Sequence, residues 1–260
     1  MKQNERDDYS VFSAHLMDLC WRRDDRDVIT ASDFLTEAEQ KAAEQILNGK
    51  DHLLFGGFED AERRIVVFLP GYYALSDIIS EPKLCGITYL NVMMSGYDIG
   101  KGNVLTNRDV LGTVMSTGIK RESIGDIASE GGLASVAVKD KVADFLHGEI
   151  KKIGGFSVDT VVSDKPVISV VRKYIEKRIT VSSPRLDGII AGIFDVSRDK
   201  AAEYVRAGLV SVNGDVSQKT DRKLEFGDTV SLRGKGKARI RFTGDTSRKG
   251  RDVLIALIYS

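Results

Sequence analysis

The stretch SRDKAAEYVRAGLVSVNG, residues 197–214, decides the fold of the C-terminal third of this 260-residue chain. Ser197 is a residue type that caps helices, and Gly208 stands where a helix commonly ends on a left-handed residue. The apolar run Leu209–Val212 then meets Asn213-Gly214, the strongest short signal for a hairpin turn. Three residues at helical spacing are expected to face inward: Ala201, Ala202 and Val205. The stretch therefore predicts a capped helix, a strand and a hairpin.

The flanking sequence extends the same unit on both sides. Upstream, Arg185–Ile193 predicts a short helix with one apolar face, made of Leu186, Ile189, Ile190 and Ile193. Downstream, a turn at Gly227-Asp228 precedes the strand Thr229–Leu232. We expect two short helices on a small twisted sheet, in a domain over residues 183–260. Residues 166–182 are expected to be a connector with one extended or helical piece.

Charge is distributed unevenly along the chain, although the net charge is zero. From Ser183 onward there are 15 Lys/Arg against 10 Asp/Glu, and the preceding residues hold 23 against 28. Between Ser231 and Arg251 there are eight basic residues and one acid, Asp245. A basic surplus confined to one part of a chain favours a polyanionic partner for that part.

The basic run after the last predicted strand has a regular spacing. Its cations fall on alternate residues, so an extended chain would present all of them on one side: Arg233, Lys235, Lys237, Arg239 and Arg241. Arg248, Lys249 and Arg251 continue the run. Such a row can follow a phosphate backbone and release its counterions. The alternative is a solvated edge strand whose charges prevent aggregation; we favour RNA binding.

A second basic group decorates the two predicted helices. Its basic members are Arg185, Arg198, Lys200 and Arg206, and Ser197 is a further candidate RNA contact beside them. Ser197 begins a helix whose free backbone N–H groups favour a phosphate. Arg206 is equally placed to pair with Glu203 or Asp199 on its own helix, and without a motif such charges would serve only solubility.

The middle of the chain, residues 81–165, predicts a β-α-β-β-α-β order, which is the ferredoxin-like arrangement shared by RNA-recognition-motif (RRM-like) domains. The expected elements are strands at 87–93, 123–128, 133–138 and 156–162 and helices at 107–115 and 140–150. Asn107 is the expected cap of the first helix. The aromatic RNA-recognition signature is absent from the third strand, so base stacking on this sheet is not expected. Lys120 and Arg121 lie in a loop from which they could touch a phosphate.

Residues 1–80 predict a mixed α/β region. Phe12, Leu16 and Leu19 form a helical stripe, and Thr36 with Glu39 forms a capping box. Strand-like runs follow at 52–55 and 64–69. Trp21, close to the stripe, is expected in the core. The whole chain is therefore expected to be α+β.

Few residues of the sequence indicate disulfide, metal-binding or catalytic chemistry. Cys20 and Cys85 are far apart and are expected to be buried, reduced thiols. Three scattered histidines and isolated carboxylate pairs suggest no metal, cofactor or catalytic site. Since the chain shows no secretory signal and no membrane-spanning run, we expect a cytoplasmic protein.

Four blocks of the C-terminal third resemble the S-four RNA-binding domain: SPRLD (183–187), SRDKA (197–201), AGLVSVNG (207–214) and GDTV (227–230). The resemblance implies that the two-helix face and the neighbouring loop hold RNA. Leu111-Gly112, GIKRESIGDI (118–127) and SLRGKG (231–236) further resemble the bacterial YlmH family. That resemblance implies a non-enzymatic protein that binds the large (50S) ribosomal subunit, 23S rRNA and tRNA in ribosome-associated quality control and C-terminal tailing, with a link to cell division.

Two alternatives stay open at this point. S-four domains also accompany pseudouridine synthases and methyltransferases, so the chain could belong to an rRNA-modifying enzyme. No catalytic domain or Gly-rich cofactor loop is visible, however, and the first 182 residues leave little room for one. The other alternative is a protein–protein adaptor with an incidental basic tail.

Overall fold

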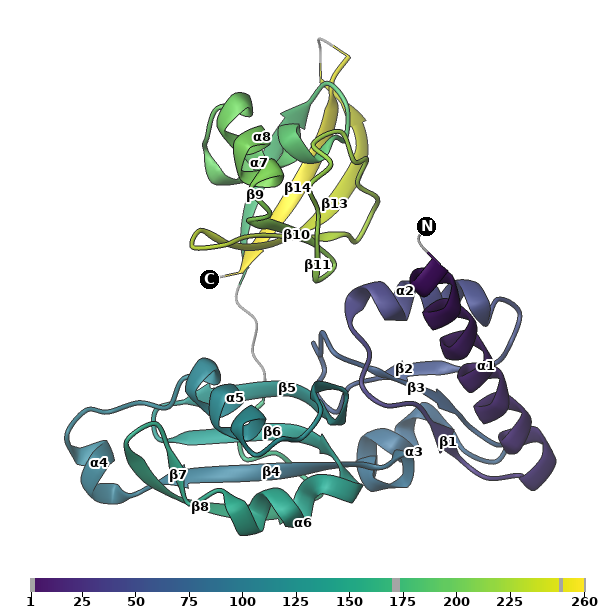
Figure 1. Cartoon of the computed structure of the whole chain (residues 1–260), viewed down its shortest axis with the longest axis vertical. Coiled ribbons are helices and arrows are strands. Elements are labelled where there is room, and N and C mark those ends of the chain that lie inside the picture. The colour runs from purple at the N-terminus through teal and green to yellow at the C-terminus, as the bar shows by residue number, and fades with distance from the viewer. Residues whose placement is uncertain (1–2, 170–173, 248–249, 260) are drawn as a thin grey trace. The chain divides into compact units, whose positions relative to one another are not determined.

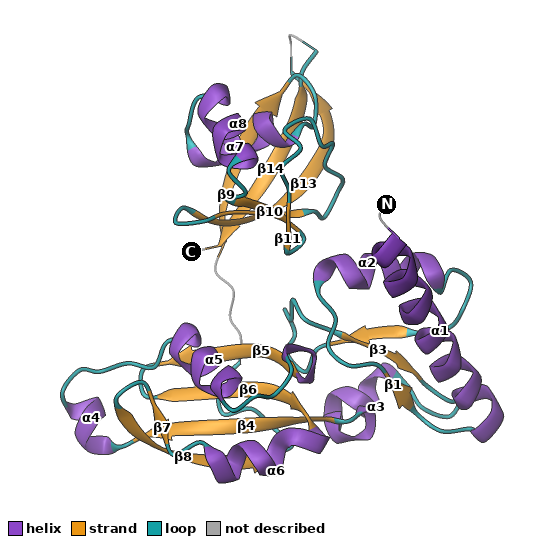
Figure 2. Ribbon diagram, viewed as in Figure 1, coloured by secondary structure: helices purple, strands orange, loops and turns teal. Residues whose placement is uncertain are grey.

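The computed structural model describes residues 3–169, 174–247 and 250–259, and the chain divides into two units, Met1–Val171 and Arg172–Ser260 (Figure 1). Helices and antiparallel sheets occur in both units, so the predicted α+β class is confirmed (Figure 2). No helix among the described residues is long and apolar enough to cross a membrane.

The first unit begins with a helix beside a small antiparallel sheet of order β1-β3-β2. The elements are α1 (Gln3–Arg26), β1 (Thr30–Ala31), α2 (Glu37–Ile46), β2 (Leu53–Phe55), β3 (Ile65–Phe68) and α3 (Leu75–Ser80). The predicted capping box is present, because the Thr36 side chain accepts from the Glu39 N–H and the Glu39 carboxylate accepts from the Thr36 N–H. The predicted helices and strands of this region are confirmed.

The sequence suggested that Trp21 lies in the core, and this prediction is wrong. Leu16, Leu19 and Cys20 are buried, whereas Trp21 is 56% exposed. Successive residues of a helix are turned by about 100°. Because the buried stripe of α1 passes through Leu16, Leu19 and Cys20, the next residue points away from it.

A five-stranded antiparallel sheet of order β5-β6-β4-β8-β7 forms the centre of this unit. Its elements are 3₁₀ helix η1 (Pro82–Cys85), β4 (Ile87–Met94), α4 (Gly96–Gly100), α5 (Asn107–Ser116), 3₁₀ helix η2 (Arg121–Ser123), β5 (Ile124–Glu130), β6 (Leu133–Lys139), α6 (Asp140–Glu149), β7 (Lys152–Ile153) and β8 (Phe156–Ser163). The four long strands have the split β-α-β order that the sequence predicted. Thr106, not Asn107, caps α5, since its hydroxyl accepts from the Asp109 N–H.

The helices α5 and α6 cover one face of this sheet, and the N-terminal region covers much of the other. Phe34, Phe58 and Ile78 pack with Ile87 and Tyr89 of β4 in one core. Lys139 of β6 also donates to the Ser32 carbonyl at 2.9 Å.

The chain after β8 crosses the same covered face. The backbone N–H of Val167 donates to the Asn91 side chain, and that of Ile168 donates to the Ser135 hydroxyl. Asn91 in turn donates to the Lys165 carbonyl at 2.9 Å. Residues 1–80 and 81–165, which the sequence separates as two domains, therefore share one packed unit.

The second unit is a six-stranded antiparallel sheet with two helices on one face (Figure 1). Its elements are β9 (Tyr174–Val181), α7 (Leu186–Phe194), α8 (Arg198–Arg206), β10 (Val210–Val212), β11 (Asp215–Val216), β12 (Thr229–Leu232), β13 (Gly236–Thr246) and β14 (Asp252–Tyr259). The strand order is β11-β10-β12-β13-β14-β9. The predicted connector 166–182 thus contains an edge strand that pairs along its whole length with β14. Ile179 and Val181 of this strand are buried in the core, whereas Glu176 and Arg178 are exposed.

Local signals in residues 197–214 are confirmed in detail. The Ser197 hydroxyl accepts from the Lys200 N–H and caps α8. Gly208 follows the helix with φ +69°, in the left-handed region that glycine tolerates best. Asn213 and Gly214 have φ of 56° and 94° and join β10 to β11 in a tight hairpin.

Candidate nucleic-acid interface

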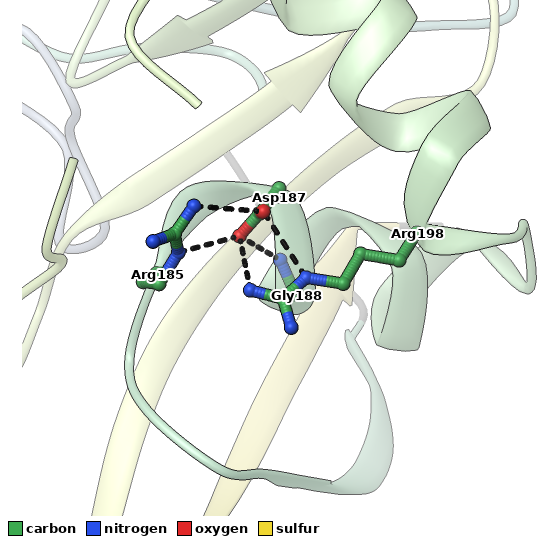
Figure 3. A network of polar contacts seen from close by, with 4 residues as sticks. All are labelled: Arg185, Asp187, Gly188 and Arg198. Atoms are coloured by element: carbon green, nitrogen blue, oxygen red, sulfur yellow. Dashed lines mark hydrogen bonds and ion pairs between the residues drawn. The ribbon is translucent and has the colours of Figure 1, made fainter. Parts of the chain in front are cut away.

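One buried carboxylate organises the start of both helices in the C-terminal unit. Asp187, in the first turn of α7, accepts two hydrogen bonds from Arg185, each 3.2 Å long. It accepts two more from Arg198, at 3.1 and 3.3 Å, and one from the Gly188 N–H at 2.8 Å. Figure 3 shows both guanidinium groups directed at this carboxylate from opposite sides. Asp187 therefore ties the first residue of α8 to the start of α7.

The electrostatics of this group favour an anion outside it. Burial alone would raise the pKa of Asp187, but hydrogen bonds from Arg185 and Arg198 lower it below its ordinary value. Arg185 and Arg198 therefore share this ionised carboxylate, and Asp221 in the neighbouring loop is a second acid whose charge acts on Arg185. Each guanidinium has five N–H donors and uses two of them here, which leaves three for another partner. The side chains of Arg185 and Arg198 remain 37% and 53% exposed.

The loop at 217–224 brings further cations to this group. Backbone hydrogen bonds from Leu186 and Asp187 to the loop carbonyls of Arg222 and Thr220 hold it beside α7. The cations of the loop are Lys219, Arg222 and Lys223. These cations match no motif, and only the charge of the run QKTDRK, residues 218–223, marks them in the sequence. We call Arg185, Arg198, Lys219, Arg222 and Lys223 the helix-loop cluster.

Other predicted contacts on α8 have different surroundings. Lys200 pairs with Glu203 at 2.6 Å, and its Nζ lies 5.4 Å from the centre of the Tyr204 ring. Glu203 forms its ion pair with Lys200, which lowers the pKa of Glu203, and the charge of Arg206 lowers it further. Arg206 is exposed in the last turn of α8, about 12 Å along the helix from Arg198. The structure therefore places Arg198 in the helix-loop cluster and Arg206 away from it.

The row of five alternating cations is interrupted. Arg233 and Lys235 lie in the turn between β12 and β13, where Gly234 has φ +80°. Only the last three, Lys237, Arg239 and Arg241, alternate along β13. Because Ala238 and Ile240 between them are buried in the core with α7 and α8, these three point to the opposite face of the sheet. Lys237, Arg239 and Arg241 therefore do not lie beside the helix-loop cluster. Arg248 and Lys249 lie outside the described residues.

The two RNA contacts predicted in the central domain, Lys120 and Arg121, have different surroundings. Lys120 is highly exposed and lies 3.5 Å from the Glu122 carboxylate. Arg121 instead donates to the carbonyls of Ile124 and Gly125, and burial lowers its pKa to about 10. These hydrogen bonds hold the start of β5 in place. Arg121 therefore has a structural role, and Lys120 remains the predicted RNA contact of this loop.

Both cysteines are buried free thiols, as predicted. Burial raises the pKa of Cys85 to about 11. Among the residues that the structure describes, no group of three His, Cys, Asp or Glu side chains could hold a metal ion.

Comparison with known proteins finds matches to the central domain and to most of the chain. The family described as "Putative RNA-binding domain in YlmH" matches residues 99–165, from α4 to the end of the central domain. The chain is 28% identical over 221 residues to the ribosome-associated protein quality control protein P2 of Bacillus subtilis (strain 168), and this alignment covers 84% of the chain and 82% of that protein. The solved structure of the cell division protein ylmH from Streptococcus pneumoniae is 20% identical, with a TM-score of 0.43, over 62% of this chain and 92% of that one.

Of the two sequence matches, one covers the central domain, and the other extends over most of both proteins. Both matches confirm the inferred resemblance to the YlmH family.

Proposed function

We propose that this protein binds ribosomal RNA without catalysing a reaction, and that the helix-loop cluster is its principal contact. The observation that carries the proposal is the Asp187 carboxylate, which orients two arginine forks at the start of two helices. Arginine forks match phosphate geometry, and helix N-termini favour anions. Asp187 reduces the mobility of both side chains before any ligand arrives, which lowers the ordering cost of binding.

The covered face of the central sheet supports the same choice. RRM-like domains stack bases on the sheet face opposite their helices. Here that face packs against the N-terminal region and the segment 165–168. The RNA contacts of the family-matched domain are therefore proposed for its loops, with Lys120 as one candidate, and not for its sheet.

We place this binding on the large ribosomal subunit in the cytoplasm. The supporting observation is the relative from Bacillus subtilis, whose name describes a ribosome-associated quality control protein. We propose contact with 23S rRNA and tRNA and a role in C-terminal tailing of stalled nascent chains, with cell division affected through translation. The absence of an enzymatic role belongs to the same proposal.

The proposal is tested by sedimentation and by salt dependence. Purified protein mixed with 50S subunits should co-sediment at 0.1 M salt, and the logarithm of the affinity for 23S rRNA should fall linearly with the logarithm of salt concentration.

The double variant Lys219→Gln/Lys223→Gln leaves the Asp187 contacts intact and should weaken binding about tenfold or more. The matched control Arg26→Gln/Lys50→Gln, on the N-terminal region, should bind like the wild type. A flat salt dependence, or no co-sedimentation, would refute the proposal, and modified nucleosides formed by the pure protein would refute its non-enzymatic part.

A further inference from the structure

The C-terminal sheet has two chemically different faces. Ala238 and Ile240 of β13 and Leu254 and Ala256 of β14 are buried beneath α7 and α8. The residues that alternate with them point away from the helices. They form what we call the outer sheet face: Tyr174 and Arg178 of β9, Lys237, Arg239 and Arg241 of β13, and Ile255, Leu257 and Tyr259 of β14.

We propose that the outer sheet face binds a single-stranded segment of RNA, with bases on its apolar centre and phosphates along its cations. This inference rests on the proposed RNA-binding function and adds a second contact surface on the opposite side of the sheet from the helix-loop cluster. Neither the matched family, which ends at residue 165, nor the Asp187 group includes these residues.

The register of the strands places cations on both sides of an apolar strip. Ile255 of β14 lies opposite Arg241 on one neighbouring strand and opposite Arg178 on the other. Leu257 lies between Arg239 of β13 and Glu176 of β9. Since neighbouring strands are about 4.8 Å apart, Arg178 stands roughly 10 Å across the strip from the cations of β13. A strip of this width can take a base while the flanking cations take its phosphates.

Aromatic rings lie at one end of the strip. The rings of Tyr174 and Tyr259 meet edge to face with centroids 5.0 Å apart, and Lys237 Nζ lies 5.4 Å from the centre of the Tyr259 ring. Aromatic side chains beside cations are the usual platform for single-stranded nucleic acid, because every base has a face that can stack. Duplex RNA keeps its bases inside, so it would not use the rings.

A groove continues the outer sheet face beyond Lys237. It has a volume of about 470 Å³, within the range of sites for small ligands, and a nucleotide would fit it. The Ser211 and Ser231 hydroxyls bond to each other in its wall, and Arg233 and Lys237 supply charge. Glycines complete the lining and let a sugar-phosphate backbone approach closely: Gly208, Gly214, Gly234 and Gly236.

The charge of this surface is complementary to a polyanion. Its acids are Glu176, opposite Leu257, and Asp245, which lies 3.8 Å from Arg178. Cations outnumber these acids, and Arg241 and Arg178 are exposed. In an RNA strand the bases can cover the apolar strip and the rings while the phosphates meet the cations. We therefore assign the surface to RNA.

The cations are tested on the full-length protein with a fluorescent, unstructured RNA of 12 nucleotides. Lys237→Gln/Arg239→Gln/Arg241→Gln should lose about fivefold in affinity at 0.1 M salt for each phosphate contact removed, and its salt slope should fall by about 0.7 per contact. The control Arg26→Gln/Lys50→Gln/Lys83→Gln removes three exposed cations from the first unit and should bind like the wild type. Equal affinities of the two triple variants would overturn the inference.

The stacking component is tested at Tyr259. Tyr259→Phe keeps the ring and should bind the oligonucleotide like the wild type, whereas Tyr259→Leu keeps an apolar side chain and should bind roughly 5- to 100-fold more weakly. Indistinguishable affinities of Phe and Leu variants would count against stacking and overturn the inference in this form. Polyglutamate binding that is lost in the Gln triple variant, with RNA binding retained, would assign the face to an acidic protein instead.

The two proposals fail differently. If the wild type binds neither 23S rRNA nor the oligonucleotide, the proposed function is wrong. If it binds both, and the variants of the outer sheet face bind both like the wild type, only the present inference is wrong.

Discussion

At the scale of single residues, the Asp187 carboxylate does the most to organise the candidate interface. It is 7% exposed, yet both arginines that contact it are substantially exposed. The carboxylate is therefore shielded from water while its partners can reach a ligand. Arg185 precedes α7 and Arg198 begins α8, so their proximity depends on how the two helices pack, and the carboxylate between them accepts hydrogen bonds from both side chains.

Replacing Asp187 by Asn should destabilise the C-terminal unit by about 1–3 kcal/mol, because two guanidinium groups lose a charged acceptor. The folded-state pKa of Asp187 lies below its unfolded value. Its contribution to stability is therefore complete above about pH 4 and is lost as the pH falls through the lower folded-state pKa. Urea denaturation from pH 7 to pH 2 measures the difference between the wild type and Asp187→Asn. That difference should shrink below about pH 4, and a constant difference would contradict this explanation.

At the scale of elements, two glycines differ in whether tertiary packing requires the absence of a side chain. Gly125, in β5, lies under the ring of Phe34, and a Cβ added there would be 2.6 Å from the nearest ring atom. Nothing in the sequence around 125 signals this, because Phe34 is far away along the chain. Gly112, inside α5, has open space around it. Adding a methyl group at these two glycines should therefore have opposite effects on stability.

Gly125→Ala should destabilise the first unit by about 1–3 kcal/mol, because Phe34 or the strand must move to make room. Gly112→Ala is the matched control and should stabilise it by about 0.5–1 kcal/mol, since alanine has the higher helix propensity. Chemical denaturation followed by circular dichroism measures both. A neutral Gly125→Ala would show that the contact between the N-terminal region and the central sheet is loosely packed.

At the scale of the whole molecule, the chain has two units with separate hydrophobic cores. The C-terminal core contains only residues from Ile179 onward, and the clusters of the first unit contain none of them. Each core is thus complete within its own unit among the described residues. The chemistry is divided as well, since both proposed RNA surfaces, the helix-loop cluster and the outer sheet face, belong to the second unit.

Substitutions in the two cores should therefore act independently. Asp187→Asn should lower the transition of the C-terminal unit, and Gly125→Ala that of the first unit. In the double variant the two free-energy changes should add within about 0.5 kcal/mol. Differential scanning calorimetry of the four proteins measures this. A coupling free energy above about 1 kcal/mol would show that the two units unfold together.

The sequence by itself determined the local structure of this protein. The cap at Ser197 and the turn at Asn213-Gly214 follow from interactions within a few residues, so local patterns predict them. The succession of helices and strands along the central domain was predicted from local patterns as well. The same patterns could not show that Arg233 and Lys235 lie in a turn.

Only the tertiary structure decided which charges share a surface. It joined Arg185 and Arg198 through Asp187, added the loop cations and turned Lys237, Arg239 and Arg241 to the opposite face. It also showed that Tyr174–Val181, expected in a connector, is an edge strand of the same sheet. The physical reason is that side-chain direction follows from which face of an element is buried, and burial depends on neighbours that are distant along the chain.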